Sequence, residues 1–368
     1  VNGRTDDGVN VKAEEVKLTT DGNIGEKDNF FVTEAEKAAM KSENLYLKNE
    51  GSLILDNTEA AKDADLDVNG DVTTAEGAVL EADNLHITAE NADLTTNVKD
   101  LSGNVTGSIS VTDKGSIAVT GTLTAGEDVS IQAAENGNIT VTGTIHAANT
   151  FLRGAAKIII TVKNTMGNMD VETSDREDSS VDMKLESCDR SQDLNISTPG
   201  EVRLTTTEAD EIIDFFADRI QVTGGANNAI LNFTKAPAGL KVRVPGGNNL
   251  INVTTTMAPT DIQTGNGDDT FILGGPVEDE TDSEYTYKYK DENGFMGAGN
   301  LHRLDIATEG GSNTWHLWMS GEKFYLTGGM GNDTFIRYTF EVTDKEGQTY
   351  TFATRDYNIS SLSGNITC

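Results

Sequence analysis

The chain has 368 residues, of which 60 are acidic and 28 are basic, so its formal net charge is −32. This excess of negative charge argues against nucleic acids and anionic membranes as partners, because both carry the same sign of charge. Aromatic residues make up only 6 % of the chain and no apolar run is long enough to span a bilayer, so we expect a narrow aliphatic core and no membrane insertion.

The first predicted element is one short helix within an N-terminal edge or cap, residues 1–43. Thr33 and Glu36 have the spacing of a capping box, and good helix formers follow as far as Lys41. We therefore expect residues 33–41 to form a helix on the edge of a coil.

Residues 44–200 read as short strands separated by turns. The runs that begin at Gly107, Gly115 and Gly137 alternate β-branched residues with small polar ones, and Gly, Asn or Asp stands between the runs. Only five prolines occur in the chain, which suits long hydrogen-bonded ladders. We predict a β-solenoid over this region.

Residues 201–340 repeat an Asn or Asp that is followed two positions later by a large apolar residue, at intervals of about 20 residues. This period is typical of a solenoid coil, and the apolar residues should stack inward in one column. The expected pairs are Asp210/Ile212, Asn228/Ile230, Asn249/Ile251, Asp269/Phe271, Asn293/Phe295, Asn313/Trp315 and Asp333/Phe335. A helix over 208–220 also fits the apolar spacing there, although the coil period favours strands.

Two stretches interrupt this register. Residues 285–296 fit either a coil with Asn293 in the column or a hairpin that leaves the stack, and residues 338–352 have a similar alternating pattern. Both follow Asp-Thr-Phe-Ile, which favours paired hairpins. We expect residues 341–368 to form a C-terminal hairpin or cap.

The segments that end at Ile272 and Ile336 read Thr-Gly-Asn-Gly-Asp-Asp-Thr-Phe-Ile and Gly-Gly-Met-Gly-Asn-Asp-Thr-Phe-Ile. They resemble the calcium-binding nonapeptides of RTX proteins, which are secreted bacterial toxins, enzymes and adhesins. The resemblance implies Ca²⁺ held by the turns. The implied metal-site residues are Gly265, Gly267, Asp268, Asp269, Gly329, Gly331 and Asp333.

This sequence departs from the RTX pattern because its two nonapeptides are not in tandem. Asn249 and Asn313 stand where a neighbouring repeat would carry Asp. A second interpretation therefore stays open, in which the aspartates cap turns by bonding backbone amides and hold no metal.

The runs at Gly107, Gly115 and Gly137 also resemble filamentous-haemagglutinin-type adhesins. Together the features predict an all-β fold: a right-handed parallel β-helix with coils of about 20 residues, one short helix and hairpin excursions. Cys188 and Cys368 show no metal spacing, and a disulfide between them stays open.

We expect a structural or adhesive segment of a large secreted or cell-surface bacterial protein, and not an enzyme. Its expected partners are a surface glycan or protein of a host or neighbouring cell, or copies of itself. The alternative is a β-helical polysaccharide lyase or glycoside hydrolase, with Arg203, Arg219 and Arg243 forming a stripe along one face as a saccharide groove.

Overall fold

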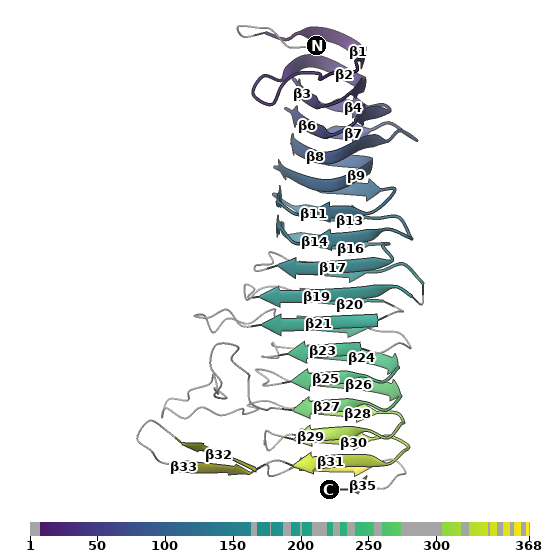
Figure 1. Ribbon diagram of the computed structural model, residues 1–368, viewed down its shortest axis with the longest axis vertical. Helices are drawn as coiled ribbons and strands as arrows, with labels where there is room; N and C mark the ends of the chain where they lie inside the picture. The colour runs from purple at the N-terminus through teal and green to yellow at the C-terminus, as the bar shows by residue number, and fades with distance from the viewer. Residues whose placement is uncertain are drawn as a thin grey trace. The chain divides into compact units, whose positions relative to one another are not determined.

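The computed structural model describes residues 8–162, 168–176, 178–186, 193–198, 201–207, 219–223, 229–233, 240–253, 260–273, 304–317, 324–337, 339–343, 349–353, 357–361 and 366–367. Within these ranges the chain is all-β and contains no helix, and hence none long and apolar enough to cross a membrane. Two compact units divide the chain, Val1–Asp175 and Arg176–Cys368. Each unit is a parallel β-solenoid whose coils stack about 20 residues apart (Figure 1). The boundaries predicted after residues 43, 200 and 340, and the right-handed coil, stay predictions.

In the first unit, most coils contribute a strand to each of three parallel columns. β10, β13 and β16 lie in one column, β11, β14 and β17 in the second, and β12 and β15 in the third. The strands of this unit are β1 (Val11–Thr19), β2 (Phe31–Ser42), β3 (Leu45–Asn49), β4 (Leu53–Leu55), β5 (Thr58–Ala60), β6 (Asp63–Val68), β7 (Val72–Thr74), β8 (Leu80–Ala89), β9 (Ala92–Val105), β10 (Ile109–Asp113), β11 (Ile117–Val119), β12 (Thr122–Ala125), β13 (Asp128–Gln132), β14 (Asn138–Val141), β15 (Thr144–His146), β16 (Asn149–Arg153), β17 (Lys157–Val162) and β18 (Asn168–Glu172).

The core of the first unit is built from stacked aliphatic side chains. Because side chains alternate across a strand and the strands are in register, one residue per coil falls into the same inward column. One such column is fully buried and consists of Leu94, Val111, Ile131, Leu152 and Val171. No large ring is needed there, which agrees with the low aromatic content.

The helix predicted over residues 33–41 is wrong, because these residues lie in β2. Its burial alternates along the strand, and both edges are paired: β1 lies on one side, and β3, β4 and β5 lie on the other. Thr33 caps nothing; it is buried and its Oγ1 donates to Asn49 Oδ1 at 2.8 Å. Helix propensity differs by less than about 1 kcal/mol per residue, so a two-sided ladder and burial in a core outweigh it.

In the second unit, each coil contributes strands to two columns. One column contains β23, β25, β27, β29 and β31, and the other contains β22, β24, β26, β28 and β30. The strands are β19 (Ser180–Glu186), β20 (Asp193–Ser197), β21 (Glu201–Thr207), β22 (Arg219–Thr223), β23 (Ala229–Phe233), β24 (Leu240–Gly246), β25 (Leu250–Val253), β26 (Thr260–Asn266), β27 (Thr270–Leu273), β28 (Leu304–Thr308), β29 (Thr314–Leu317), β30 (Phe324–Gly328), β31 (Asp333–Arg337), β32 (Thr339–Thr343), β33 (Thr349–Ala353), β34 (Tyr357–Ser361) and β35 (Ile366–Thr367).

The predicted apolar column is confirmed at Ile251, Phe271, Trp315 and Phe335, which are in register and buried. The Phe271 and Trp315 rings stack with centroids 4.1 Å apart and planes at 17°, and Trp315 and Phe335 stack at 5.2 Å and 14°. Three coils of this unit are therefore joined by one aromatic stack.

Two positions in the predicted register are wrong. Leu231 stands in the column beside Ile251, while Ile230 pairs with Leu250 and is only half-buried, so the pair Asn228/Ile230 is shifted by one residue. Three apolar residues in succession, 229–231, left the phase of this strand ambiguous. β27 also pairs directly with β29, so no coil carrying Asn293 and Phe295 lies between them. Asp210, Ile212 and most of 208–220 lie outside the described residues.

The predicted hairpin after the second nonapeptide is confirmed. β32 and β33 pair antiparallel, with Phe340 opposite Phe352 and Val342 opposite Tyr350. Residues 285–296, the other predicted hairpin, lie outside the described residues, and so do Cys188 and Cys368.

Candidate functional site

The candidate calcium residues lie at the turns that precede β27 and β31 in the second unit. Asp269 and Asp333 are buried there and belong to one vertical column with Asn249 and Asn313, one residue per coil. In stacking order the column reads Asn249, Asp269, Asn313, Asp333, so amide and carboxylate alternate. We call these four residues the Asn/Asp column.

Each asparagine of the column donates two hydrogen bonds to the carboxylate of the following coil. Asn249 donates to Asp269 Oδ1 from its backbone N at 2.9 Å and from Nδ2 at 2.8 Å. Asn313 bonds Asp333 Oδ1 in the same way, at 3.2 and 2.8 Å. In the other direction, Asn313 Oδ1 accepts from the backbone N of Asp269 at 3.0 Å. The column therefore joins successive coils through side chains as well as through strand ladders.

The second oxygen of each carboxylate, Oδ2, lacks the hydrogen-bond partners that the corresponding atom of asparagine, Nδ2, has. Asn313 Nδ2 also bonds Thr308 Oγ1 at 3.1 Å and the carbonyl of Gly310 at 3.3 Å. Asp269 Oδ2 and Asp333 Oδ2 are buried and make no hydrogen bond within the described part of the chain, and neither does Thr264 Oγ1. A buried acceptor left without a donor costs about 1–3 kcal/mol. These oxygens suit either a cation or a hydrogen-bond donor.

The neighbour of this second oxygen changes along the stack. Thr264, Thr308 and Gly328 occupy equivalent register positions beside the column. A Cβ built on Gly328 would lie 1.8 Å from Asp333 Oδ2, so the carboxylate fills the space that a side chain would take. Burial raises the pKa of Asp269, whereas the neighbouring Thr264 hydroxyl and the two donors of Asn249 oppose that shift. Burial therefore favours the binding of a proton or a cation by this carboxylate.

The predicted glycines are required by the close stacking of the turns, with or without a metal. A Cβ on Gly267 would lie 1.9 Å from the carbonyl oxygen of Gly247, and one on Gly331 would lie 1.8 Å from that of Gly311. For Gly265 the nearest atom would be the carbonyl oxygen of Pro245, at 1.7 Å, and for Gly329 it would be the carbonyl carbon of Glu309, at 2.2 Å.

Asp268 points away from the column, although it is the neighbour of Asp269. It is exposed, accepts from Ser312 N at 2.7 Å, and its own N donates to Asn248 Oδ1 at 2.9 Å. These three residues form a second, outward ladder at the same turn.

The predicted metal residues therefore share one edge of the stack but do not converge on one point. The coil of Asn313 separates Asp269 from Asp333, which places them about 10 Å apart, two strand spacings. No group of three or more His, Cys, Asp or Glu side chains suited to a metal occurs among the described residues. If calcium binds here, each aspartate must bind a separate ion together with carbonyl oxygens of its turn. Calcium binding stays a prediction.

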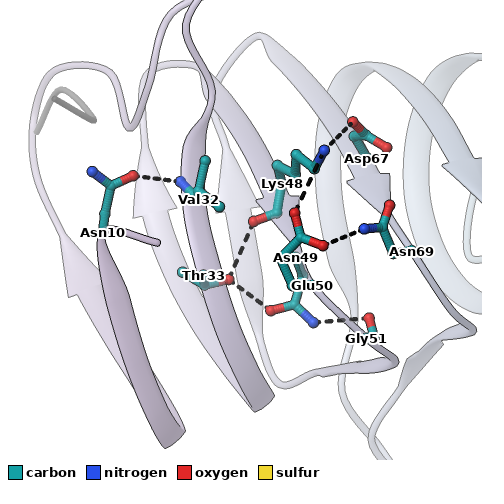
Figure 2. Close-up of polar contacts among 9 residues, drawn as sticks. All are labelled: Asn10, Val32, Thr33, Lys48, Asn49, Glu50, Gly51, Asp67 and Asn69. Carbon is teal, nitrogen blue, oxygen red and sulfur yellow. Dashed lines mark hydrogen bonds and ion pairs between the residues drawn. The ribbon is translucent and has the colours of Figure 1, made fainter. Parts of the chain in front are cut away.

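The first unit has a buried amide in a comparable place, shown in Figure 2. Asn49, at the end of β3, accepts at Oδ1 from Thr33 Oγ1 at 2.8 Å and from Ala35 N at 3.0 Å. Its Nδ2 donates to the carbonyls of Ala35 and Gly51 at 3.1 and 2.9 Å. Both ends of this amide are satisfied, which the sequence did not reveal because Thr33 was assigned to a helix cap.

Further polar side chains link the coils of the first unit along one corner. Each member bonds the residue above or below, for example Asn91 Nδ2 to Asp71 Oδ1 at 2.8 Å and Asn149 Nδ2 to Asp128 Oδ1 at 2.6 Å. The complete ladder is Ser52, Asp71, Asn91, Ser108, Asp128, Asn149 and Asn168. An alignment on the polar residue that directly precedes or begins each strand would have found this ladder.

The three arginines considered for a saccharide groove do not share one column of strands. Arg203 lies in β21, in one column of strands, while Arg219 and Arg243 lie in β22 and β24 of the other column. Arg243 pairs with Thr223 in the ladder and so stands four positions along from Arg219. Its guanidinium donates to Asp261 Oδ2 at 2.5 Å.

No family model, curated protein or solved structure matches this chain. The likeness to RTX repeats and to filamentous-haemagglutinin-type adhesins therefore rests on the quoted motifs alone.

Proposed function

We propose that this chain is a structural and adhesive segment of a large secreted or cell-surface protein, and that it acts through its outward faces. The observation that carries the proposal is the use of the polar side chains at the turns. In both units these side chains bond the coil above or below, as in the ladder from Ser52 to Asn168 and in the Asn/Asp column. Such residues serve the rigidity of a stack, which is what a spacer or adhesive segment requires.

Surface charge supports the same function. Ion pairs join neighbouring coils on the outside of the first unit, including Lys37 with Asp56, Lys62 with Glu43 and Lys99 with Asp83, at 3.0, 2.7 and 2.6 Å. Exposed pairs contribute little stability each. They reduce repulsion between acidic side chains of neighbouring coils, while the net charge of −32 favours solubility.

Calcium is the second part of the proposal. The buried Oδ2 atoms of Asp269 and Asp333 have no donor in the described residues, and carboxylate and carbonyl oxygens are the ligands that Ca²⁺ prefers. An ion at each aspartate would neutralise a buried charge and couple folding of the second unit to a calcium-rich medium outside the cell. This would also explain why Asp alternates with Asn instead of being replaced by it.

The test of adhesion uses beads coated with the full chain. Beads coated with the native chain should stay on bacterial or animal cell layers under flow, and beads coated with the heat-denatured chain at equal density should not. The denatured chain is the matched control because it has the same composition and charge. Equal retention of both kinds of bead would contradict the proposal. Release of unsaturated or reducing sugar ends from polysaccharides by the same preparation would favour the enzymatic alternative.

A further inference from the structure

The outward face of β26, β28 and β30 carries a hollow of about 490 Å³ in the second unit. Its floor and rim come from three successive coils and the turns that follow them. The lining includes Gln263, Thr264, Ala307, Glu309, Thr327 and Met330.

The sequence explains why the face is hollowed here. Gln263, Ala307 and Thr327 stand side by side in the ladder, so the short Ala307 lies between two longer side chains. At the turn, Gly310 bridges to Met330 and has no side chain. A Cβ on Gly310 would lie 2.4 Å from the side-chain oxygen Oδ1 of Asn266, which is exposed and could move aside. The hollow is therefore formed by a short side chain on the strand and a glycine at the turn.

Exposed apolar groups gather at this hollow. Met330, on its rim, is 65 % exposed, the largest value for a large apolar side chain among the described residues. Tyr325, two positions before Thr327 on the same strand, is 42 % exposed. Single exposed apolar residues are ordinary, but two beside one hollow are typical of a contact surface, and methionine adapts to varied partners.

The charge around the hollow is negative. Glu309 is exposed on the rim, and Asp261 and Asp305 lie in the outward row that leads to Tyr325. Two cations on β24 border this row: Lys241 is the ladder partner of Asp261, and Arg243 is the ladder partner of Gln263 and forms an ion pair with Asp261. A second copy of this chain, also at −32, would be repelled, whereas a positively charged partner would be attracted.

We propose that this hollow docks a basic peptide segment of a partner protein, with an apolar side chain seated against Met330 and Ala307 and a lysine or arginine facing Glu309. The inference rests on the proposed function only in assuming that the chain works through its outward faces. It adds the place and the chemistry of one contact.

The test is a titration of the full chain with two labelled probes at physiological ionic strength, the amidated peptides Lys-Leu-Lys-Leu-Lys and Lys-Gly-Lys-Gly-Lys. The leucine peptide should bind saturably and more tightly. Met330→Ser and Ala307→Gln should weaken it about tenfold, the loss expected for one buried apolar side chain. Glu309→Gln should weaken both peptides and reduce the dependence of binding on salt.

The matched control is Ile54→Ser, which removes an exposed apolar side chain of β4 in the first unit and should change nothing. Equal binding of the two peptides, unaffected by Met330→Ser, would reduce the effect to general charge attraction and overturn the proposal, as would no binding at all. Tighter binding of a neutral oligosaccharide such as cellohexaose, lost in Met330→Ser, would overturn the peptide assignment. If the peptide titration fails while beads coated with the native chain still adhere, only this inference fails and the proposed function stands.

Discussion

The coils of both units stack through the same kind of ladder, but the buried carboxylates of the two units differ in their hydrogen-bond donors. In the first unit, Asp113 is buried and receives donors on both oxygens: Thr96 Oγ1 and Val98 N bond Oδ2, and Gly115 N bonds Oδ1, each at 2.8 Å. In the second unit, Asp269 receives its donors on Oδ1 only. A buried carboxylate with donors on both oxygens has its hydrogen bonds satisfied and serves the structure. A buried carboxylate with one oxygen lacking a donor can still bind a ligand there.

The two units also differ in the composition of their cores. The first unit has three strand columns around aliphatic side chains, and the second has two columns with the stacked rings of Phe271, Trp315 and Phe335 between them. Three large rings therefore add to the aliphatic core of the second unit, whereas the first unit is stabilised by many small side chains. The following predictions, from the largest effect to the smallest, test this contrast.

Trp315→Ala should destabilise the second unit by about 3–5 kcal/mol, because it removes the central ring of the stack. Calorimetry should show the loss in one transition and leave the first unit unchanged. Trp315→Phe is the control: the indole N–H makes no hydrogen bond within the described residues, so this change should cost far less. Equal losses for the two variants would mean that the ring stack is not what stabilises the unit.

Gly267→Ala should cost about 1–3 kcal/mol, since its Cβ would meet the carbonyl oxygen of Gly247 at 1.9 Å and the turns would have to separate. Urea denaturation measures the change. Gly121→Ala in the first unit is the control, because its Cβ would approach nothing closer than 3.8 Å. A neutral result at Gly267 would show that the turns are less tightly stacked than described.

Asp269→Asn should stabilise the calcium-free protein by about 1 kcal/mol, because an amide can donate to the turn where the carboxylate oxygen has no donor. Thermal melts without and with millimolar Ca²⁺ measure this. If calcium binds, the native chain should gain about 2.7 kcal/mol at 100 times the dissociation constant, and the variant should lose much of that gain.

Two controls separate the possible causes. Mg²⁺ at equal ionic strength accounts for general screening, since it suits a carbonyl-rich turn poorly. Asn49→Asp in the first unit is the reverse change and should destabilise, because Asn49 Nδ2 donates to two carbonyls. Equal gains from both ions, unchanged in Asp269→Asn, would argue against a specific calcium site.

The smallest effect concerns pH. Burial raises the pKa of Asp65, which faces His86 and lies near Asp63, Asp67 and Lys27. A raised folded-state pKa means that the folded protein binds the proton more tightly, so stability should rise as the pH falls from neutral toward about 4. The effect should stay below about 1 kcal/mol for a half-buried group. Asp65→Asn should remove this rise in stability, which urea melts at several pH values would measure. A rise of the same size in the variant would show that Asp65 is not its cause.

Much of the fold followed from the sequence alone. The recurrence of Asn or Asp two residues before an apolar residue predicted Ile251, Phe271, Trp315 and Phe335 correctly, because a repeated coil places equivalent residues in one column. The alternating stretch at 339–353 likewise predicted the hairpin of β32 and β33. Period and alternation are local properties, and local patterns can be read without the neighbouring coils.

Other features were decided by the tertiary structure. The segment 33–41 has the composition of a helix and became β2, because ladders on both sides and the narrow core favour an extended strand. The phase at 229–231 was settled by pairing with β25, and the direct contact of β27 with β29 removed Asn293 from the column. Which oxygen of Asp113 or Asp269 accepts a hydrogen bond depends on residues one coil away. The residues adjacent in sequence do not reveal those contacts.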